Sequence, residues 1–388
     1  MPRRQFAALG AAALSLLPLA ACSYEEVGGN EAAEQVAPTA DPMASNDDPA
    51  AKLPPEDKPR PLMQAQVVLD RLGFTPGVID GKMGMSTVNA LKGFQEAHGL
   101  EVTGELDHAT QQALAEWRHI PATRVVTIPA DFANEQFVQI PKEREDQAKL
   151  DRMAYSSLGE KIAERFHTTE EVLAELNAQP AAPASGALDA AQSNETSAQS
   201  NEGAPKPALA FRAGMQLRVP NIGADKFDPS AVKDPKWADT LRLLGVGTEQ
   251  PKAAKIEVDK SDQVLRVLDG QGKLLAQFTA TMGSSQFPLP LGTWKIRGTA
   301  YNPPWQYDPS LLATADKSDP KLEIPPGPNN PIGVVWIDLS KEHYGIHGTD
   351  EPNRIGRAES NGCIRLTNWD AARLAQMVGT GVEAVFKA

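Results

Sequence analysis

The sequence of 388 residues predicts a multidomain chain with a small all-α domain, a middle α+β segment and a mostly-β C-terminal domain. Apolar residues at helical spacing, interrupted by glycines, run through residues 59–120. Strand and helix patterns are mixed in residues 121–223, whereas apolar and polar residues alternate through much of residues 252–388. A hydrophobic content of 41% allows packed cores, and 32 prolines indicate substantial linkers between them.

Residues 1–21 have the pattern of an export signal that ends at a cysteine. A short positive region precedes an apolar run from Phe6 to Leu19, which is too short for a transmembrane helix. The stretch from Leu19 to Cys22 then matches the box that lipoprotein signal peptidase cleaves. We therefore expect Cys22 to become the lipidated N-terminus. The alternative is an ordinary cleaved signal with an incidental cysteine.

The charge of the chain argues against nucleic acid as a partner. The formal net charge is −12, and loss of the two arginines of the signal would lower it by two, to −14. Residues 22–58 are acidic, rich in alanine and proline and poor in large apolar residues, so we expect a disordered tether. The residue directly after the lipidation site is Ser23. Two-membrane bacteria generally forward lipoproteins to the outer membrane when this position is not aspartate. This favours an anchor at the periplasmic face of the outer membrane, without a membrane span.

Residues 59–120 predict three short helices. The first ends at Gly73, the second begins near Ser86 and ends at Gly99, and Asp107 caps the third. The landmarks of this stretch resemble the small three-helix peptidoglycan-binding domain; they are Asp80-Gly81-Lys82, Phe94-Gln95, His98-Gly99-Leu100 and Thr103-Gly104. The resemblance implies binding to glycan strands of the cell wall. The alternative is a three-helix module without this affinity.

The middle segment, residues 121–223, opens with a predicted strand at Val125 and Val126. Leu158, Ile162 and Phe166 follow at helical spacing, and Thr168 and Glu171 predict a capping box for a further helix. The two helices and the later stretch 213–220 resemble a degenerate LysM glycan-binding repeat. In this interpretation a run at 179–208, expected to be disordered, replaces the usual compact loop. The alternative is a helical connector.

The C-terminal domain, residues 252–388, is predicted to be mostly strands. Alternation marks strands around Ile256, Ala276 to Met282 and Trp294, and Asp269-Gly270-Gln271-Gly272 marks a hairpin turn. Val334 to Leu339 predicts a central strand. Asn368 or Asp370 is expected to cap a helix that ends near Gly379, and Val382 to Phe386 predicts the last strand.

A thiol and an imidazole in this domain predict nucleophilic catalysis. Cys363 follows Gly362, and His347 lies sixteen positions earlier. A nearby histidine can hold a cysteine as thiolate, and a glycine allows a substrate carbonyl to approach the backbone. Once Cys22 is lipidated, Cys363 has no disulfide partner in the mature chain, which favours a reactive thiol.

The motif His347-Gly348-Thr349 followed by Ser360-Asn361-Gly362-Cys363-Ile364-Arg365-Leu366 resembles the active-site signature of the L,D-transpeptidases, the YkuD-type family. The resemblance implies a mostly-β catalytic fold with Cys363 as nucleophile and His347 as base. It also implies that the carbonyl of Gly348 orients the imidazole, and that the N–H groups of Gly362 and Cys363 stabilise the oxyanion.

Further residues of the motif are candidates for substrate binding. Arg365 is suited to a carboxylate of the stem peptide, with a structural ion pair as the alternative. Ser360 and Tyr344 are also candidates, as is Asn361, which stands where many family members have histidine. No cofactor is expected. A metal site at His343 and His347 is disfavoured because no third ligand stands at a recognisable spacing.

The resemblance implies an enzyme that joins peptidoglycan stem peptides by 3→3 cross-links, through a thioester and with release of D-alanine. Water as acceptor would make it an L,D-carboxypeptidase. A protein as acceptor, such as an outer-membrane protein, would make it a protein-anchoring enzyme. A wall-binding lipoprotein with an inactive catalytic domain is the alternative from another class.

Overall fold

The structure is a computed structural model that describes Met43, Leu53 and residues 58–178, 210–223, 227–284, 287–312, 315–357 and 362–388. The predicted signal and lipidation site at Cys22, nearly all of the tether and the run at 179–208 lie outside the described residues. Ser360 and Asn361 also lie outside them.

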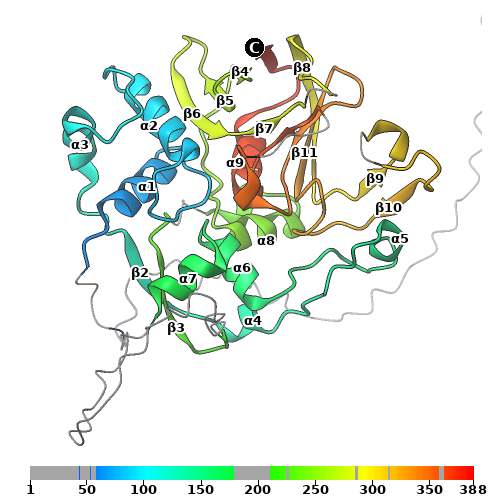
Figure 1. Cartoon of the computed structure of the whole chain (residues 1–388), viewed down its shortest axis with the longest axis horizontal. Coiled ribbons are helices and arrows are strands. Elements are labelled where there is room, and N and C mark those ends of the chain that lie inside the picture. The colour runs from blue at the N-terminus through cyan, green and yellow to red at the C-terminus, as the bar shows by residue number, and fades with distance from the viewer. Residues whose placement is uncertain are drawn as a thin grey trace, which may run out of the picture. The chain divides into compact units, whose positions relative to one another are not determined.

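The helices and strands of the described residues are numbered in the order in which they occur along the chain (Figure 1). The helices are α1 (Pro61–Arg71), α2 (Met85–Ala97), α3 (His108–Leu114), α4 (Ala130–Ala133), α5 (Arg144–Gln147), α6 (Leu158–Arg165), α7 (Glu170–Leu176), α8 (Pro235–Leu244) and α9 (Asn368–Met377). The strands are β1 (Phe74–Thr75), β2 (Thr123–Thr127), β3 (Gln216–Pro220), β4 (Lys255–Asp259), β5 (Val264–Leu268), β6 (Leu274–Thr279), β7 (Thr281–Met282), β8 (Gly292–Tyr301), β9 (Trp305–Tyr307), β10 (Leu322–Ile324), β11 (Val335–Leu339), β12 (Gly345–His347), β13 (Ile364–Arg365) and β14 (Glu383–Lys387).

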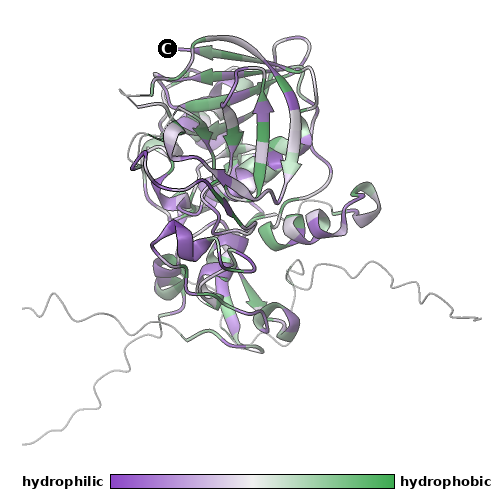
Figure 2. Cartoon of the chain, turned by 90° about the vertical axis from the view of Figure 1, so that its right-hand side faces the viewer, coloured by the Kyte–Doolittle hydropathy of each residue, from purple (hydrophilic) through white to green (hydrophobic). Residues whose placement is uncertain are grey.

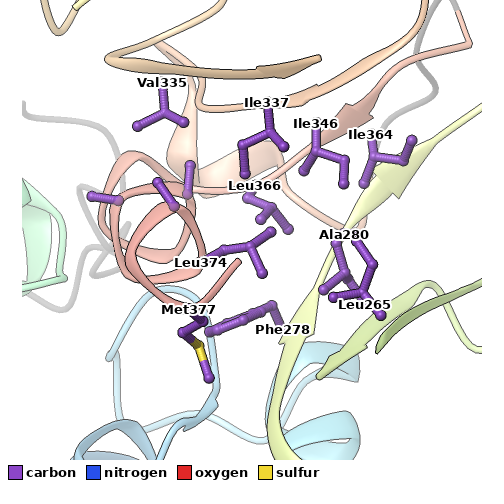
Figure 3. Close-up of a cluster of buried hydrophobic side chains, with 14 of the residues drawn as sticks. Leu265, Phe278, Ala280, Val335, Ile337, Ile346, Ile364, Leu366, Leu374 and Met377 are labelled. Atoms are coloured by element: carbon purple, nitrogen blue, oxygen red, sulfur yellow. The ribbon is translucent and has the colours of Figure 1, made fainter. Parts of the chain in front are cut away.

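One sheet of ten strands runs in the order β1-β6-β5-β4-β14-β8-β11-β12-β13-β7 among the described residues, and all of these strands except β1 belong to the C-terminal domain. Colours on its strands change between hydrophobic and hydrophilic along their length, because side chains alternate between the two faces (Figure 2). The hydrophobic core lies between this sheet and helices α8 and α9. In Figure 3 Leu374 and Met377 of α9 face apolar side chains of the strands, among them Phe278, Ile337 and Ile346. Buried helix α9 thus fixes the strands that carry the candidate site.

The three predicted helices of the N-terminal domain are present as α1, α2 and α3. Gly73 and Gly99 follow α1 and α2 with φ of +85° and +67°, and Asp107 accepts from the N–H of Thr110. The turn-rich stretch after α1 also forms β1, which was not predicted and pairs in parallel with β6 of the ten-stranded sheet. The core of the three helices includes Leu268 and Leu274 of the C-terminal domain, so the two domains share a continuous apolar contact.

Among the described residues, the middle segment has the order strand, four helices, strand. Strand β2 pairs antiparallel with β3, and helices α4 to α7 lie between them in the chain. Helices α6 and α7 are the two that the sequence predicted. The predicted capping box at Thr168 is wrong, because Thr169 caps α7 by accepting from the N–H of Val172. Thr168 is buried and donates instead to the carbonyl of Ile79, across to the N-terminal domain. The Thr168 side chain therefore makes a tertiary hydrogen bond in place of the helix cap that was predicted for it.

A buried polar cluster joins the N-terminal domain, the middle segment and the C-terminal domain. Asp70 of α1 lies 3.2 Å from Nδ1 of His167, and Nε2 of His167 lies 2.9 Å from the carbonyl oxygen of Leu244. Arg373 of α9 donates to the carbonyl of Asp70 at 2.8 Å, and the ring of His167 stacks on Trp369. Burial opposes ionisation of Asp70, but the charges of His167 and Arg373 hold its pKa below the usual value.

The predicted fold class is confirmed: a helical N-terminal region, a middle segment with helices and a mostly-β C-terminal domain. One capping prediction in the C-terminal domain is wrong. Helix α9 is capped by Thr367, which accepts from the N–H of Asp370, so neither Asn368 nor Asp370 is the cap. In the part of the chain that the structure describes, no helix has the length and apolar character that crossing a membrane requires.

Candidate active site

The candidate thiol and imidazole are brought together by two neighbouring parallel strands. Strand β12 pairs with β13 so that Ile346 is opposite Ile364 and His347 is opposite Arg365. The two isoleucines are fully buried in the core. Since side chains alternate along a strand, His347, Cys363 and Arg365 share the opposite face. The sixteen-residue separation is thus closed by sheet pairing.

His347 is held in one orientation and one tautomer. Its Nδ1 lies 2.7 Å from the carbonyl oxygen of Gly348 and donates to it, which leaves the lone pair on Nε2. The ring stacks on Trp336 of β11, with centroids 5.5 Å apart and planes 17° apart. Burial, aided by the positive charge of Arg365, lowers the pKa of His347 from 6.5 to about 3. The imidazole is therefore neutral at rest.

Cys363 is not part of a disulfide, and its side chain is partly exposed. Burial of its sulfur raises the pKa of the thiol, although a hydrogen bond from the Gly345 backbone and the charge of Arg365 oppose this. Its Sγ also lies 3.9 Å from the carbonyl oxygen of His343. The expectation of a preformed thiolate is therefore not supported by the electrostatics at rest, which favour a neutral thiol beside a neutral imidazole.

Gly362 meets two requirements that only glycine satisfies here. Its φ is +102°, which L side chains rarely adopt, and an added Cβ would lie 2.7 Å from the ring of Tyr344. Tyr344 is half-buried and packs against the core that supports β12. Tyr344 thus covers the backbone next to the thiol, which places it where a substrate would approach.

Arg365 lies close enough to influence both the candidate thiol and the candidate imidazole. Its positive charge acts on Cys363 and on His347, lowering the pKa of each. Its Nε is buried and has no hydrogen-bond partner among the described residues. An unpaired buried N–H is a donor available to a ligand.

Asn368 supports the turn that follows His347, a role not predicted from the sequence. Its Oδ1 accepts from the N–H groups of Val334 and Thr349, each at 3.2 Å, and its side chain is fully buried. Added Cβ atoms at Gly333 and Gly348 would lie 2.0 and 2.1 Å from this oxygen. The Asn368 side chain therefore fixes the peptide that orients the imidazole.

A groove of about 930 Å³ lies beside this turn, between the middle segment and residues 350–353. The described residues that line it include no lysine or arginine and seven carboxylates, those of Glu160, Glu164, Glu170, Glu171, Glu175, Asp350 and Glu351. Such a groove has a negative potential.

The two histidines of the motif do not share an environment. His347 is buried on β12, whereas His343 precedes the strand, is exposed and has φ of +64°. Among the described residues, no group of three or more His, Cys, Asp or Glu side chains is arranged to hold a metal ion.

Comparison with known proteins places these observations in a family. The "L,D-transpeptidase catalytic domain" (YkuD) model matches residues 253–386, and the "Putative peptidoglycan binding domain" model matches residues 61–114. The chain is 30% identical over 186 residues to the "Putative L,D-transpeptidase in ATP synthase subunits region ORF 5" of Fuscovulum blasticum. This match covers 46% of the chain and 93% of that protein. The chain belongs to the L,D-transpeptidase family.

Other relatives match over shorter stretches. The chain is 54% identical to "Putative L,D-transpeptidase YkuD" of Bacillus licheniformis over 56 residues, 14% of this chain. It is also 54% identical over 54 residues, again 14% of this chain, to the protein of that name in Bacillus subtilis. These matches span about a third of the two relatives, 34% and 33%.

Among solved structures, an L,D-transpeptidase from Mycobacterium smegmatis matches with 24% identity and a TM-score of 0.28, over 34% of this chain and 58% of that one. The C442S mutant of the Enterococcus faecium L,D-transpeptidase matches with 16% identity and a TM-score of 0.27, over 40% and 65%. The predictions of an L,D-transpeptidase catalytic domain and of a preceding peptidoglycan-binding domain are confirmed by the family models.

Proposed function

We propose that this L,D-transpeptidase acts on peptidoglycan stem peptides and joins them by 3→3 cross-links. One observation carries the proposal. Paired strands β12 and β13 place a thiol and an imidazole on one face, and the imidazole keeps its Nε2 lone pair because Nδ1 is bound to Gly348. This is the nucleophile and base arrangement of acyl transfer.

In the first half-reaction the Sγ of Cys363 attacks the carbonyl of the third stem residue, a diamino acid. Because the resting pair is neutral, the thiol proton passes to Nε2 of His347 as the S–C bond forms. The N–H groups of Gly362 and Cys363 face the oxyanion. The C–N bond to the terminal D-alanine then breaks, and His347 returns the proton to the leaving amine.

In the second half-reaction an amine of another stem attacks the thioester and gives a proton to Nε2 of His347; the C–S bond breaks as the new amide forms, and His347 passes the proton to the leaving sulfur. Arg365, whose Nε has no hydrogen-bond partner, binds a carboxylate of the stem peptide. Tyr344, Ser360 and Asn361 complete the substrate contacts. Neither half-reaction calls for a cofactor.

The remaining parts of the chain bring the catalytic domain to its substrate. The peptidoglycan-binding domain holds glycan strands, and the middle segment follows it in the chain and precedes the catalytic domain. We place the enzyme outside the cytoplasm, where cell-wall peptides are found. Lipidation of Cys22 anchors it to the periplasmic face of the outer membrane.

The test is intact-protein mass spectrometry with a disaccharide-tetrapeptide, followed by addition of an acceptor stem. An adduct at Cys363 and then a 3→3 dimer are expected. Cys363→Ala should abolish the adduct, and His347→Gln should slow it by about 10²–10⁴-fold, the range of general-base catalysis. His343→Asn is the matched control, because it removes an exposed imidazole and asparagine tolerates a left-handed backbone.

The outcomes separate the acceptors. An adduct that resolves only to tripeptide would identify water as the acceptor and the enzyme as an L,D-carboxypeptidase. Resolution only by a protein amine would identify a protein-anchoring enzyme. No adduct with any stem peptide would contradict the proposed substrate.

A further inference from the structure

An unbroken series of hydrogen bonds runs from the middle segment to the catalytic imidazole. Asn368 donates from Nδ2 to Oε1 of Glu164 at 2.8 Å, and its Oδ1 accepts from the N–H of Thr349 at 3.2 Å. That N–H belongs to the same peptide group as the carbonyl of Gly348. This carbonyl accepts from Nδ1 of His347 at 2.7 Å. A carboxylate is therefore joined to the imidazole through two amide groups.

The groups of this series have little freedom to move. Glu164, Asn368 and His347 are 6%, 0% and 3% exposed. The amide of Asn368 uses all four of its hydrogen-bonding positions, since Nδ2 also donates to the carbonyl of Pro328 and Oδ1 also accepts from Val334. Such satisfied, buried networks are rigid, and their members polarise one another.

Polarisation along this series has one direction. A negative charge on Glu164 draws the N–H dipole of Asn368 toward it and increases the negative charge on Oδ1. The same effect on the peptide group increases the negative charge on the oxygen of Gly348. An imidazolium that donates to this oxygen through Nδ1 is stabilised more than a neutral ring.

We propose that Glu164 is a positioning residue for His347, acting through the Asn368 amide and the Gly348–Thr349 peptide group. The middle segment thus completes a site whose thiol and imidazole belong to the C-terminal domain. This inference rests on the proposed function, in which His347 is the base. It assigns to a remote glutamate the part that a directly bound carboxylate plays in Ser-His-Asp enzymes.

The ionisation of Glu164 gives the inference a distinctive signature. The titratable groups that face it are Tyr155, Glu160 and, around the groove, Glu170, Glu171, Asp350 and Glu351. Burial raises the pKa of Glu164 to about 7, and the charge of Glu160 acts in the same direction against hydrogen bonds from Tyr155 and Asn368. The series therefore carries a negative charge above pH 7 and loses it below.

The experiment compares the full chain with its Glu164→Gln variant, which keeps the shape and an acceptor oxygen but has no charge. Two rates are measured from pH 5.5 to 8.5: acylation of Cys363 by a tetrapeptide stem, and alkylation of Cys363 by iodoacetamide, located by peptide mapping. We expect the wild-type rate to exceed the variant rate about tenfold near pH 8. This is the effect of a difference of about one unit in the pKa of the imidazole. The ratio should fall toward one below pH 6.

The matched control is Glu175→Gln, which removes a carboxylate of the same groove that is exposed and outside the series. It should follow the wild-type profile, so that a change of groove potential alone is distinguished from loss of the series. Tyr155→Phe removes a hydrogen bond that favours ionised Glu164 and should move the midpoint of the wild-type profile to higher pH. This second variant decides the question if Glu164→Gln does not fold.

A rate ratio that is one at every pH, or constant across the range, would overturn the inference. An unmoved midpoint in Tyr155→Phe would do the same. Failure of the proposed function looks different: the wild-type protein would not be acylated by any stem, whereas alkylation of Cys363 would still report whether Glu164 acts on His347.

Discussion

Replacing Gly348 by alanine is the smallest change that should disable the site without touching a reacting group. The added Cβ would lie 2.1 Å from Oδ1 of Asn368, whereas ordinary contacts begin at 3.4 Å, so one of the two must move by about 1.3 Å. Asn368 is fully buried and bonded on every side, and its own helix is part of the core. The turn that carries the Gly348 carbonyl must therefore yield.

This displacement acts directly on His347, the proposed base. The Gly348 carbonyl holds Nδ1 of His347 at 2.7 Å, so a shift above 1 Å breaks or reorients that bond. Misplacement of a catalytic group by about 1 Å costs on the order of 10²-fold in rate. Overpacking of this kind also destabilises a core by roughly 1–3 kcal/mol, which the fold should survive. We expect Gly348→Ala to fold and to form the thioester about 100-fold more slowly.

The assay is the rate of adduct formation at Cys363 with a tetrapeptide stem, together with the midpoint of urea unfolding. Gly298→Ala is the matched control, because a Cβ there meets no atom within 4 Å and the backbone is not left-handed. It should keep the wild-type rate. A Gly348→Ala rate within threefold of wild type, in a protein of unchanged stability, would refute the argument that this turn positions His347.

Two further substitutions test the junction of the domains and the backbone next to the thiol. Asp70→Ala removes the buried carboxylate that faces His167 and Arg373 and should lower the free energy of unfolding by about 3–5 kcal/mol, measured by urea unfolding; a loss below about 1 kcal/mol would contradict a buried ionic junction. Gly362→Ala requires a backbone angle that alanine rarely adopts and a contact of 2.7 Å with Tyr344, so adduct formation should fall at least about tenfold. Wild-type kinetics in that variant would show that the strained turn is not needed for attack.

Features encoded by neighbouring residues could be predicted from the sequence. Gly73 and Gly99 end helices because the required backbone is left-handed, and Asp107 caps α3 because its carboxylate reaches an N–H three residues ahead. The motif that contains His347 and Cys363 could also be recognised from the sequence, because each of its two segments is a short continuous stretch. In these cases one stretch of chain contains the whole physical reason.

Features that depend on a distant partner could not be predicted. Strand β1 has two residues, too few to show alternation, and exists because β6 offers a free edge. Thr168 was expected to cap a helix but bonds to Ile79, 89 positions away. Glu164 and Asn368 are separated by 204 positions, and neither stands at a spacing that marks a pair. Each of these three features depends on a tertiary contact that the local sequence does not encode.

The charges around the site explain how a neutral pair can react. Burial favours the uncharged thiol and the uncharged imidazole, so the thiolate and imidazolium are present only while the proton is transferred. Arg365 stabilises the developing thiolate but opposes the imidazolium, since its positive charge lowers the pKa of both groups. A negative charge on Glu164 polarises the Asn368 amide and the Gly348 carbonyl, which contacts the side of the ring that carries Nδ1. This stabilises the imidazolium against the charge of Arg365, and the stabilisation of the thiolate by Arg365 is kept. Opposite charges at opposite ends of the pair thus favour transfer of the proton from sulfur to nitrogen. The same arrangement makes the middle segment necessary for full activity, because it supplies the negative end.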